Sequence, residues 1–113
     1  MNNSDIIDMI NEIIDETKTL QTDTISKKQF AKGSYGIWAL EELTEWLSED
    51  YCESDIVIYD FTRAMLDCLA LAPDSKKAIF ESAIDILGRL NRRIRKESTS
   101  LTVYKALKRK EQL

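Results

Sequence analysis

The sequence predicts an all-α fold, a compact antiparallel bundle of four main helices plus a short C-terminal helix, in one domain over residues 1–113. Two observations carry this prediction. The chain has only three Gly and one Pro, too few for the many turns of a β-rich fold. Apolar residues also recur at spacings of three and four, the period of a helix with one buried face. We therefore expect helices at about 5–20, 27–49, 55–72, 75–97 and 101–110.

The first helix, expected over residues 5–20, shows a clear amphipathic pattern. Ser4 is placed to cap it, because a side-chain oxygen at that position accepts a hydrogen bond from the free amides of the first turn. Acidic residues occupy most of one face, which we expect to be exposed to solvent. The opposite, apolar face consists of Ile6, Ile7, Met9, Ile10, Ile13, Ile14, Thr17 and Leu20.

The second helix is predicted over residues 27–49 from the residues around its first turn. Ser26 and Gln29 form a capping box, and Ile25 and Phe30 stand at the two positions of a hydrophobic staple. These local signals predict a helix that starts at Lys27.

Two glycines lie inside that helix, Gly33 and Gly36, and each costs roughly 1 kcal/mol relative to Ala. One heptad-phased stripe nevertheless passes through them, formed by Phe30, Gly33, Ile37, Leu40, Thr44 and Leu47. A break would normally disturb that phase. We therefore predict a continuous helix to about Glu49, in which Gly33 allows a neighbouring backbone to approach closely.

The third helix, residues 55–72, is apolar on almost every side, which is typical of the central buried helix of a bundle. The β-branched run Ile56–Tyr59 is also compatible with a short strand, but the chain offers no second alternating run to pair with it. Pro73 ends the helix, and Asp74 or Ser75 is expected to cap the next one.

The fourth helix, residues 75–97, carries another heptad-phased stripe formed by Phe80, Ala83, Leu87, Leu90 and Ile94. The polar run 98–100, Ser-Thr-Ser, is expected to end or kink it. A short helix at 101–110 then carries Leu101, Tyr104 and Leu107 on one side.

The net charge of −4 conceals an uneven distribution. Residues 1–75 hold 16 acidic and 5 basic residues, a balance of −11, and residues 76–113 hold 4 acidic and 11 basic residues, a balance of +7. Such a split indicates a charged partner, or neutralisation of one half by the other. Two cysteines are too few for a disulfide scaffold, and no run is apolar enough to cross a bilayer. We therefore expect a cytoplasmic protein with reduced thiols and no membrane partner.

The composition also excludes several catalytic classes. The chain has no histidine, which excludes Ser-His-Asp and Cys-His sites, zincin motifs and His-containing zinc fingers. The segment from Gly33 to Gly36 lacks the spacing of the phosphate-binding glycine loops. We expect a protein that is not an enzyme and that uses no cofactor.

Carboxylates are the remaining catalytic candidates. Glu42 and Glu45 lie one turn apart on the second helix, and Asp60 lies early in the third. This arrangement resembles the MazG-like all-helical nucleotide pyrophosphohydrolases, whose pattern is Glu-x-x-Glu followed by Glu-x-x-Asp on the next helix. The resemblance implies a Mg²⁺ site at Glu42, Glu45 and Asp60 and a nucleotide substrate. Val57 stands where the third acidic ligand would be, and the simpler interpretation is a solvated helix face.

A basic cluster supports another alternative, a nucleic-acid-binding accessory protein that uses residues 89–110. A basic stripe of this kind binds phosphates through charge. The chain shows no helix-turn-helix spacing, however, and its acidic first half opposes a polyanion. The plainer interpretation is that these cations gather toward helix C-termini, where the helix dipole favours positive charge, and pairing with acidic neighbours is a further alternative. The stripe consists of Arg89, Arg92, Arg93, Lys96, Lys105 and Lys108.

The function that we favour is a small acidic protein-binding module, a regulator, inhibitor or immunity-type protein that acts through an acidic helical face. Its expected partner is another protein with a basic surface, and the sequence is also compatible with a homo-oligomer. Arg89, Arg92 and Arg93 would then mainly balance the acidic field within the fold. The expected binding residues combine carboxylates with the two tryptophans: Asp8, Glu12, Trp38, Glu41, Glu42, Glu45 and Trp46.

Overall fold

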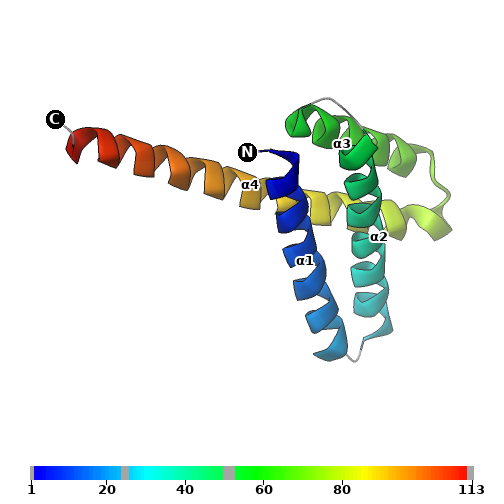
Figure 1. Ribbon diagram of the computed structural model, residues 1–113. Helices are drawn as coiled ribbons and strands as arrows, with labels where there is room; N and C mark the ends of the chain where they lie inside the picture. The colour runs from blue at the N-terminus through cyan, green and yellow to red at the C-terminus, as the bar shows by residue number, and fades with distance from the viewer. Residues whose placement is uncertain (1, 24–25, 50–52, 112–113) are drawn as a thin grey trace.

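The computed structural model describes residues 2–23, 26–49 and 53–111, with side chains as far as residue 97. In this part of the chain every regular element is helical, which confirms the all-α prediction and places Ile56–Tyr59 in a helix. The elements are α1 (Asn3–Asp23), α2 (Lys27–Glu49), α3 (Ser54–Leu71), the 3₁₀ helix η1 (Asp74–Lys76) and α4 (Lys77–Glu111) (Figure 1).

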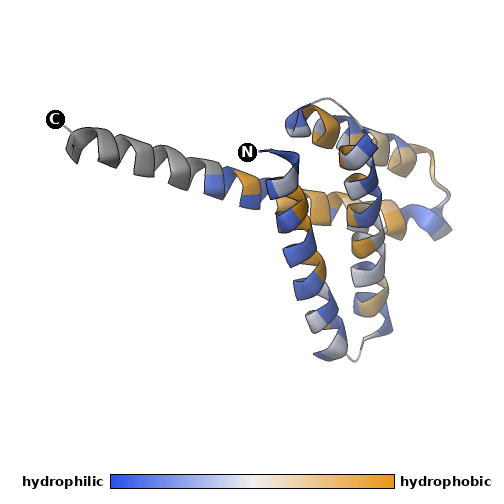
Figure 2. Ribbon diagram, in the orientation of Figure 1, coloured by the Kyte–Doolittle hydropathy of each residue, from blue (hydrophilic) through white to orange (hydrophobic). Residues whose placement is uncertain are grey.

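The helices form a bundle of two antiparallel hairpins. The hairpin of α1 and α2 lies crosswise to the hairpin of α3 and α4, and α4 packs against each of the other three helices (Figure 1). Hydrophobic and hydrophilic residues alternate around α1 and α2 with the period of the helix, as expected for helices buried on one side (Figure 2).

One face of each helix supplies the core. The largest fully buried side chains are Phe61, Ile10, Ile13, Leu40, Leu43, Leu47, Leu87, Leu90 and Val57. The predicted stripe of the first helix is confirmed except at Leu20, which is 61% exposed. The predicted stripe of the second helix is confirmed at Leu40 and Leu47 but not at Phe30, which is 50% exposed. Because α2 contacts all three other helices, it also buries residues outside that stripe: Gly36, Ala39 and Leu43.

The helix starts show one confirmed cap and one misplaced cap. Ser26 caps α2 as predicted, because its Oγ accepts a hydrogen bond from the Gln29 amide at 3.3 Å. The start of α1 lies earlier than predicted. Asn2 caps it instead of Ser4, since the Asn2 Oδ1 accepts a hydrogen bond from the Asp5 amide at 2.9 Å and Asp5 Oδ2 accepts one from the Asn2 amide. The proposed staple involves Ile25, which lies outside the described residues.

The helix α2 is continuous through both glycines, as predicted, but Gly33 does not admit a neighbouring backbone. A Cβ at Gly33 would lie 2.9 Å from the Gln21 amide nitrogen, a side-chain atom of α1. A Cβ at Gly36, which is buried, would lie 2.8 Å from the Ile86 Cδ1 of α4. The glycine at which α2 packs closely against another helix, α4, is therefore Gly36.

The prediction of a separate helix at 101–110 is wrong. The helix α4 runs without interruption from Lys77 to Glu111 and includes the run 98–100. Serine and threonine have only moderately lower helix propensity than alanine, and this stretch has no Gly or Pro that would break the backbone pattern. The polar run was too weak a signal to end the helix.

The prediction that the third helix is the central buried one is also wrong. Only Val57, Ile58, Phe61 and Met65 of α3 are buried. Its opposite side is exposed, and the two helices that pack against all the others are α2 and α4.

Candidate partner-binding surfaces

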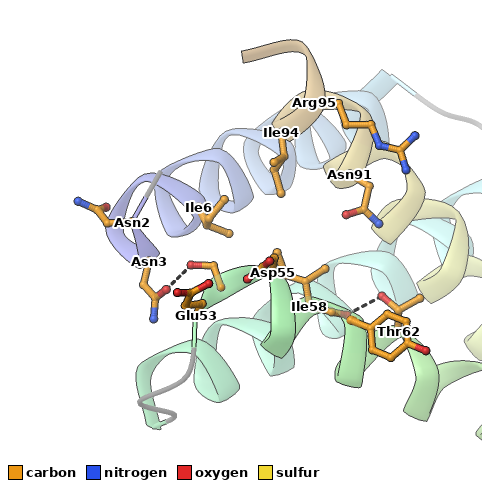
Figure 3. Close-up of a pocket in the computed structure, with 12 residues that line it drawn as sticks. Asn2, Asn3, Ile6, Glu53, Asp55, Ile58, Thr62, Asn91, Ile94 and Arg95 are labelled. Carbon is orange, nitrogen blue, oxygen red and sulfur yellow. Dashed lines mark hydrogen bonds between the residues drawn. The ribbon is translucent and has the colours of Figure 1, made fainter. Parts of the chain in front are cut away.

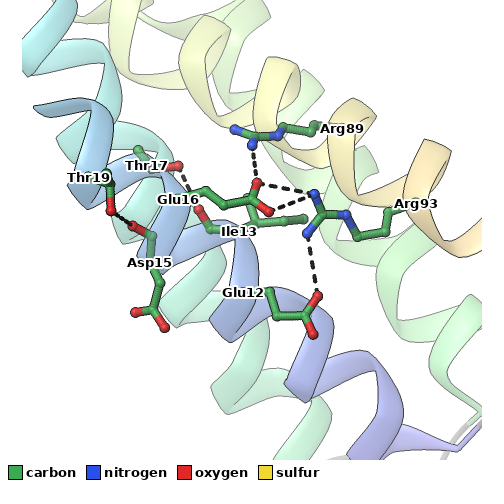
Figure 4. A network of polar contacts seen from close by, with 8 residues as sticks. All are labelled: Glu12, Ile13, Asp15, Glu16, Thr17, Thr19, Arg89 and Arg93. Carbon is green, nitrogen blue, oxygen red and sulfur yellow. Dashed lines mark hydrogen bonds and ion pairs between the residues drawn. The ribbon is translucent and has the colours of Figure 1, made fainter.

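An ion-pair network connects α1 to α4 (Figure 4). Arg93 of α4 donates from Nη2 to both carboxylate oxygens of Glu16, at 3.0 and 3.1 Å, and its Nη1 lies 3.6 Å from Glu12 Oε2. Arg89, one turn earlier, donates to the same Glu16 carboxylate. Two acidic residues of the first helix are therefore already neutralised within the fold.

This network decides how much of the predicted basic stripe remains available to an external polyanion. Arg89 and Arg93 are engaged by carboxylates, whereas Arg92 is exposed on the same helix. The side chains of Lys105 and Lys108 lie outside the described part of the structure. Of the three arginines expected to balance the acidic field, Arg89 and Arg93 thus pair with acidic residues of α1, whereas Arg92 is exposed.

The tryptophans and glutamates of α2 lie together on its outer side. Trp38, Glu42 and Glu45 follow each other at intervals of four and three residues, which places them in one stripe of the helix. Trp46, four residues after Glu42, borders that stripe. Trp38 is 40% exposed and Trp46 38% exposed, although both are large apolar side chains. We call these four residues the α2 ridge.

The two tryptophans of the ridge differ in how they are held. Trp46 packs edge-on against Phe61 of α3, with ring centroids 5.1 Å apart and an angle of 87° between the planes. Phe61 is itself 1% exposed, so this contact ties Trp46 to the core. Trp38 makes no ring contact of this kind among the described residues. The ridge therefore has one aromatic side chain that stacks against a core ring and one without such a ring contact among the described residues.

Two further predicted carboxylates, Asp8 of α1 and Glu41 of α2, lie at a similar level of the α1–α2 hairpin. Asn3 Nδ2 donates to the Leu47 carbonyl at 3.2 Å, and Gln21 Nε2 donates to the Phe30 carbonyl at 2.9 Å, which fixes the antiparallel register of the hairpin. This register places Asp8 level with the turn of α2 that contains Glu41. Both carboxylates are exposed. Of the predicted acidic residues, only Glu12 has an ion pair within the described ranges.

The alternative magnesium site is not assembled. The described residues contain no group of three His, Cys, Asp or Glu side chains placed to hold a metal ion. Glu42 and Glu45 lie on the outer stripe of α2, and Asp60 is exposed on α3. Val57, at the position where the pattern would need another acidic ligand, is 1% exposed and packs in the core.

One groove among the described residues contains none of the predicted site residues (Figure 3). It has a volume of about 950 Å³ and lies where the first turns of α1 and α3 meet α4. Apolar side chains contribute to its lining, notably Ile6, Ile58 and Ile94. Asp55 and Arg95 add opposite charges, so the groove suits a mainly apolar group with polar edges.

The fold holds one end of this groove firmly in place. Asn3 bonds to the last turn of α2 through its Nδ2, while its Oδ1 accepts a hydrogen bond from the Ser54 hydroxyl at the start of α3. Sequence reasoning missed the groove because its residues come from three distant segments. The feature of the sequence that could have indicated a further apolar surface is the composition of α3, which is more apolar than a helix with one buried face requires.

Comparisons with protein-family models, curated proteins and solved structures give no match for this chain. None of the helices in the described ranges combines the length and apolar character that a membrane span requires.

Proposed function

We propose that this protein is a protein-binding module whose α2 ridge, together with Asp8 and Glu41, binds a partner with a basic and partly apolar surface. The observation that carries this proposal is the exposure of Trp38 and Trp46 on either side of Glu42. Tryptophan is enriched among the residues that dominate binding energy at protein interfaces, because it buries a large area and also offers an N–H donor.

The charge distribution indicates the chemistry of that partner. The basic residues Arg89 and Arg93 are occupied by Glu16 and Glu12, whereas Asp8, Glu41 and Glu45 are exposed acids. A surface of this kind attracts Lys and Arg side chains, and its long-range field raises the association rate. Apolar groups of the partner would cover the tryptophan rings.

The first test uses the full chain as bait for proteins of a native lysate. We expect the double variant Trp38→Ala, Glu45→Lys to lose the partner that the unchanged protein captures. The control variant Glu81→Lys changes the charge by the same amount as Glu45→Lys, at an exposed position on α4, and should retain it. The proposal fails if the double variant captures the same proteins as the unchanged chain, or if the unchanged chain captures none.

A second test follows the captured partner after purification. Trp38 and Trp46 are the only tryptophans of the chain, so with a tryptophan-free fragment of the partner the emission reports on the ridge alone. We expect a blue shift on binding. Reversing Glu41 and Glu45 to Lys should slow association by about tenfold and flatten its dependence on salt, whereas Arg92→Glu should change neither.

A further inference from the structure

The helix α3 is more apolar than its place in the fold requires. Its buried side faces the core, yet three large apolar residues on the other side remain in solvent: Ile56 is 48% exposed, Tyr59 65% and Leu66 46%. Exposed apolar residues scattered singly are ordinary on protein surfaces, whereas a contiguous set marks an interaction site.

These residues form a contiguous set because of their spacing. Ile56, Tyr59, Arg63, Leu66 and Ala70 follow one another at intervals of three and four residues, and all five are exposed. This is the spacing by which one helix face packs against another helix. We call these five residues the α3 outer face. Tyr59 also lines the groove of Figure 3, so the two surfaces are continuous.

The charged residues of α3 beside its outer face are mainly acidic. Asp60 and Asp67 follow Tyr59 and Leu66 by one residue and are exposed, and Glu53 and Asp55 lie at the start of the helix. With Arg63 as the only cation in residues 53–71, this region has a net charge of −3. The occupant that it fits is an amphipathic helix with basic residues beside its apolar face.

The end of α4 has the complementary sequence. Residues 101–111 contain four basic residues and one acidic residue, a net charge of +3, and are helical. Their apolar residues include Leu101, Tyr104 and Leu107, at intervals of three. At a rise of about 1.5 Å per residue, Glu111 lies roughly 25 Å beyond Ile94, the last described side chain of α4 that packs against the core.

The continuity of α4 determines which copy of the chain this segment can reach. An unbroken helix cannot turn back, and its C-terminal turns lead away from the α3 with which its first half packs (Figure 1). The basic segment is therefore unable to cover the α3 outer face of its own chain.

We propose that the basic segment of α4, residues 101–111, packs on the α3 outer face of a second copy of this chain. Pairing of α3 with α3 is the weaker arrangement, because Asp60 and Asp67 lie on the same side of the stripe and would face each other across an antiparallel pair. When each copy both offers its segment and receives its partner's, the assembly closes as a twofold dimer with two identical contacts. This contact is independent of the α2 ridge.

The test is a reciprocal exchange of charge, with mass measured by sedimentation over a wide range of concentrations. The unchanged chain should associate to at least twice its mass of 13.0 kDa, and high salt should weaken this association. The α3 variant Asp60→Lys, Asp67→Lys and the α4 variant Lys105→Glu, Lys108→Glu should each weaken self-association at least tenfold. An equimolar mixture of the two variants should associate again, as should a chain that carries all four changes.

A matched control changes the same number of charges elsewhere. Asp15→Lys with Glu81→Lys alters two exposed acids outside the proposed contact and should leave association unchanged. Far-ultraviolet circular dichroism verifies that every variant retains its helices. The proposal is overturned if the unchanged chain keeps the mass of one copy, if the α4 variant associates normally, or if neither the mixture nor the fourfold variant recovers association.

Discussion

The helices α1 and α3 both contribute one face to the same core, but their sequences relate to that core in different ways. In α1 almost every large apolar residue is at least partly buried, and the acidic residues occupy the solvent side. In α3 the buried side is formed by Val57, Ile58, Phe61 and Met65, while Ile56, Tyr59 and Leu66 remain exposed on the other side.

This difference shows how to interpret an apolar helix in a small bundle. An amphipathic pattern such as that of α1 matches burial on one side and needs no further explanation. A helix that is apolar all round is central only when enough other helices surround it. With four helices in two crossed hairpins, α2 and α4 are the helices that pack against all the others, and the surplus apolar surface of α3 is left for a partner.

The largest expected effect is on the free energy of unfolding, and it compares a buried isoleucine of α1 with an exposed isoleucine of α3. Ile10→Ala removes a side chain that is 0% exposed and should lower the free energy of unfolding by about 2–5 kcal/mol. Ile56→Ala removes the same atoms from the α3 outer face and should change the free energy of unfolding by less than about 0.5 kcal/mol. Urea denaturation, followed by circular dichroism at concentrations where the chain is monomeric, measures both values. A loss above about 1 kcal/mol for Ile56→Ala would mean that the fold itself covers this face.

An intermediate effect on stability is expected within α2, where a buried glycine, Gly36, is compared with a partly exposed one, Gly33. Gly36→Ala should destabilise the fold by about 1 kcal/mol, because the new Cβ would lie 2.8 Å from Ile86 Cδ1. Gly33→Ala would press on the Gln21 side chain from Cγ to Nε2 and disturb the hydrogen bonds that Nε2 donates to Phe30 and Ser34, at an exposed site. The gain in helix propensity of up to about 1 kcal/mol should offset that loss and leave the stability nearly unchanged. Urea denaturation of the two variants measures both changes.

The companion change Ile86→Val identifies the cause, since it deletes the methyl group that Gly36→Ala would meet. In that background Gly36→Ala should become neutral or stabilising, and the double-mutant cycle should show positive coupling. If Gly36→Ala were equally harmful in the Ile86→Val background, the contact with Ile86 would not explain its cost.

The smallest expected effect concerns the acidic side of α1. Glu16→Gln removes the partner of Arg89 and Arg93 and should cost about 0.5–1 kcal/mol at low salt, since the residues involved are partly exposed. The cost, measured by urea denaturation, should shrink as salt is added. Asp8→Asn, on the same helix but without an ion pair among the described residues, should be neutral. Equal costs for the two changes would contradict the network in Figure 4.

Local sequence signals predicted the helices well where a single turn carried the information. The cap of α2 at Ser26 follows from residues within a few positions of each other. The stripe of Ala83, Leu87 and Leu90 in α4 was predicted from its spacing and is buried. Asn2 and Ser4 are both suitable N-cap residues for α1, and the local sequence did not show which of them caps the helix.

The candidate surfaces were only partly predictable for a related reason. The composition of the α2 ridge follows from spacing along one helix, so Trp38, Glu42, Glu45 and Trp46 could be grouped from the sequence. The pairing of Glu16 with Arg93 joins residues 77 positions apart, and no spacing rule connects them. The groove lined by Ile6, Ile58 and Ile94 has the same origin, in three segments that meet only after folding.

By itself, the sequence of this protein determined that the fold is helical, roughly where the helices lie, and that its two halves carry opposite charge. These properties depend on neighbouring residues, on helical periodicity and on composition. The tertiary structure alone decided which helices pack against all the others, which side of α2 and α3 faces solvent, and which acids are neutralised. Those outcomes depend on how many neighbours each helix has, and a periodic pattern shows that a face can be buried without showing what will cover it.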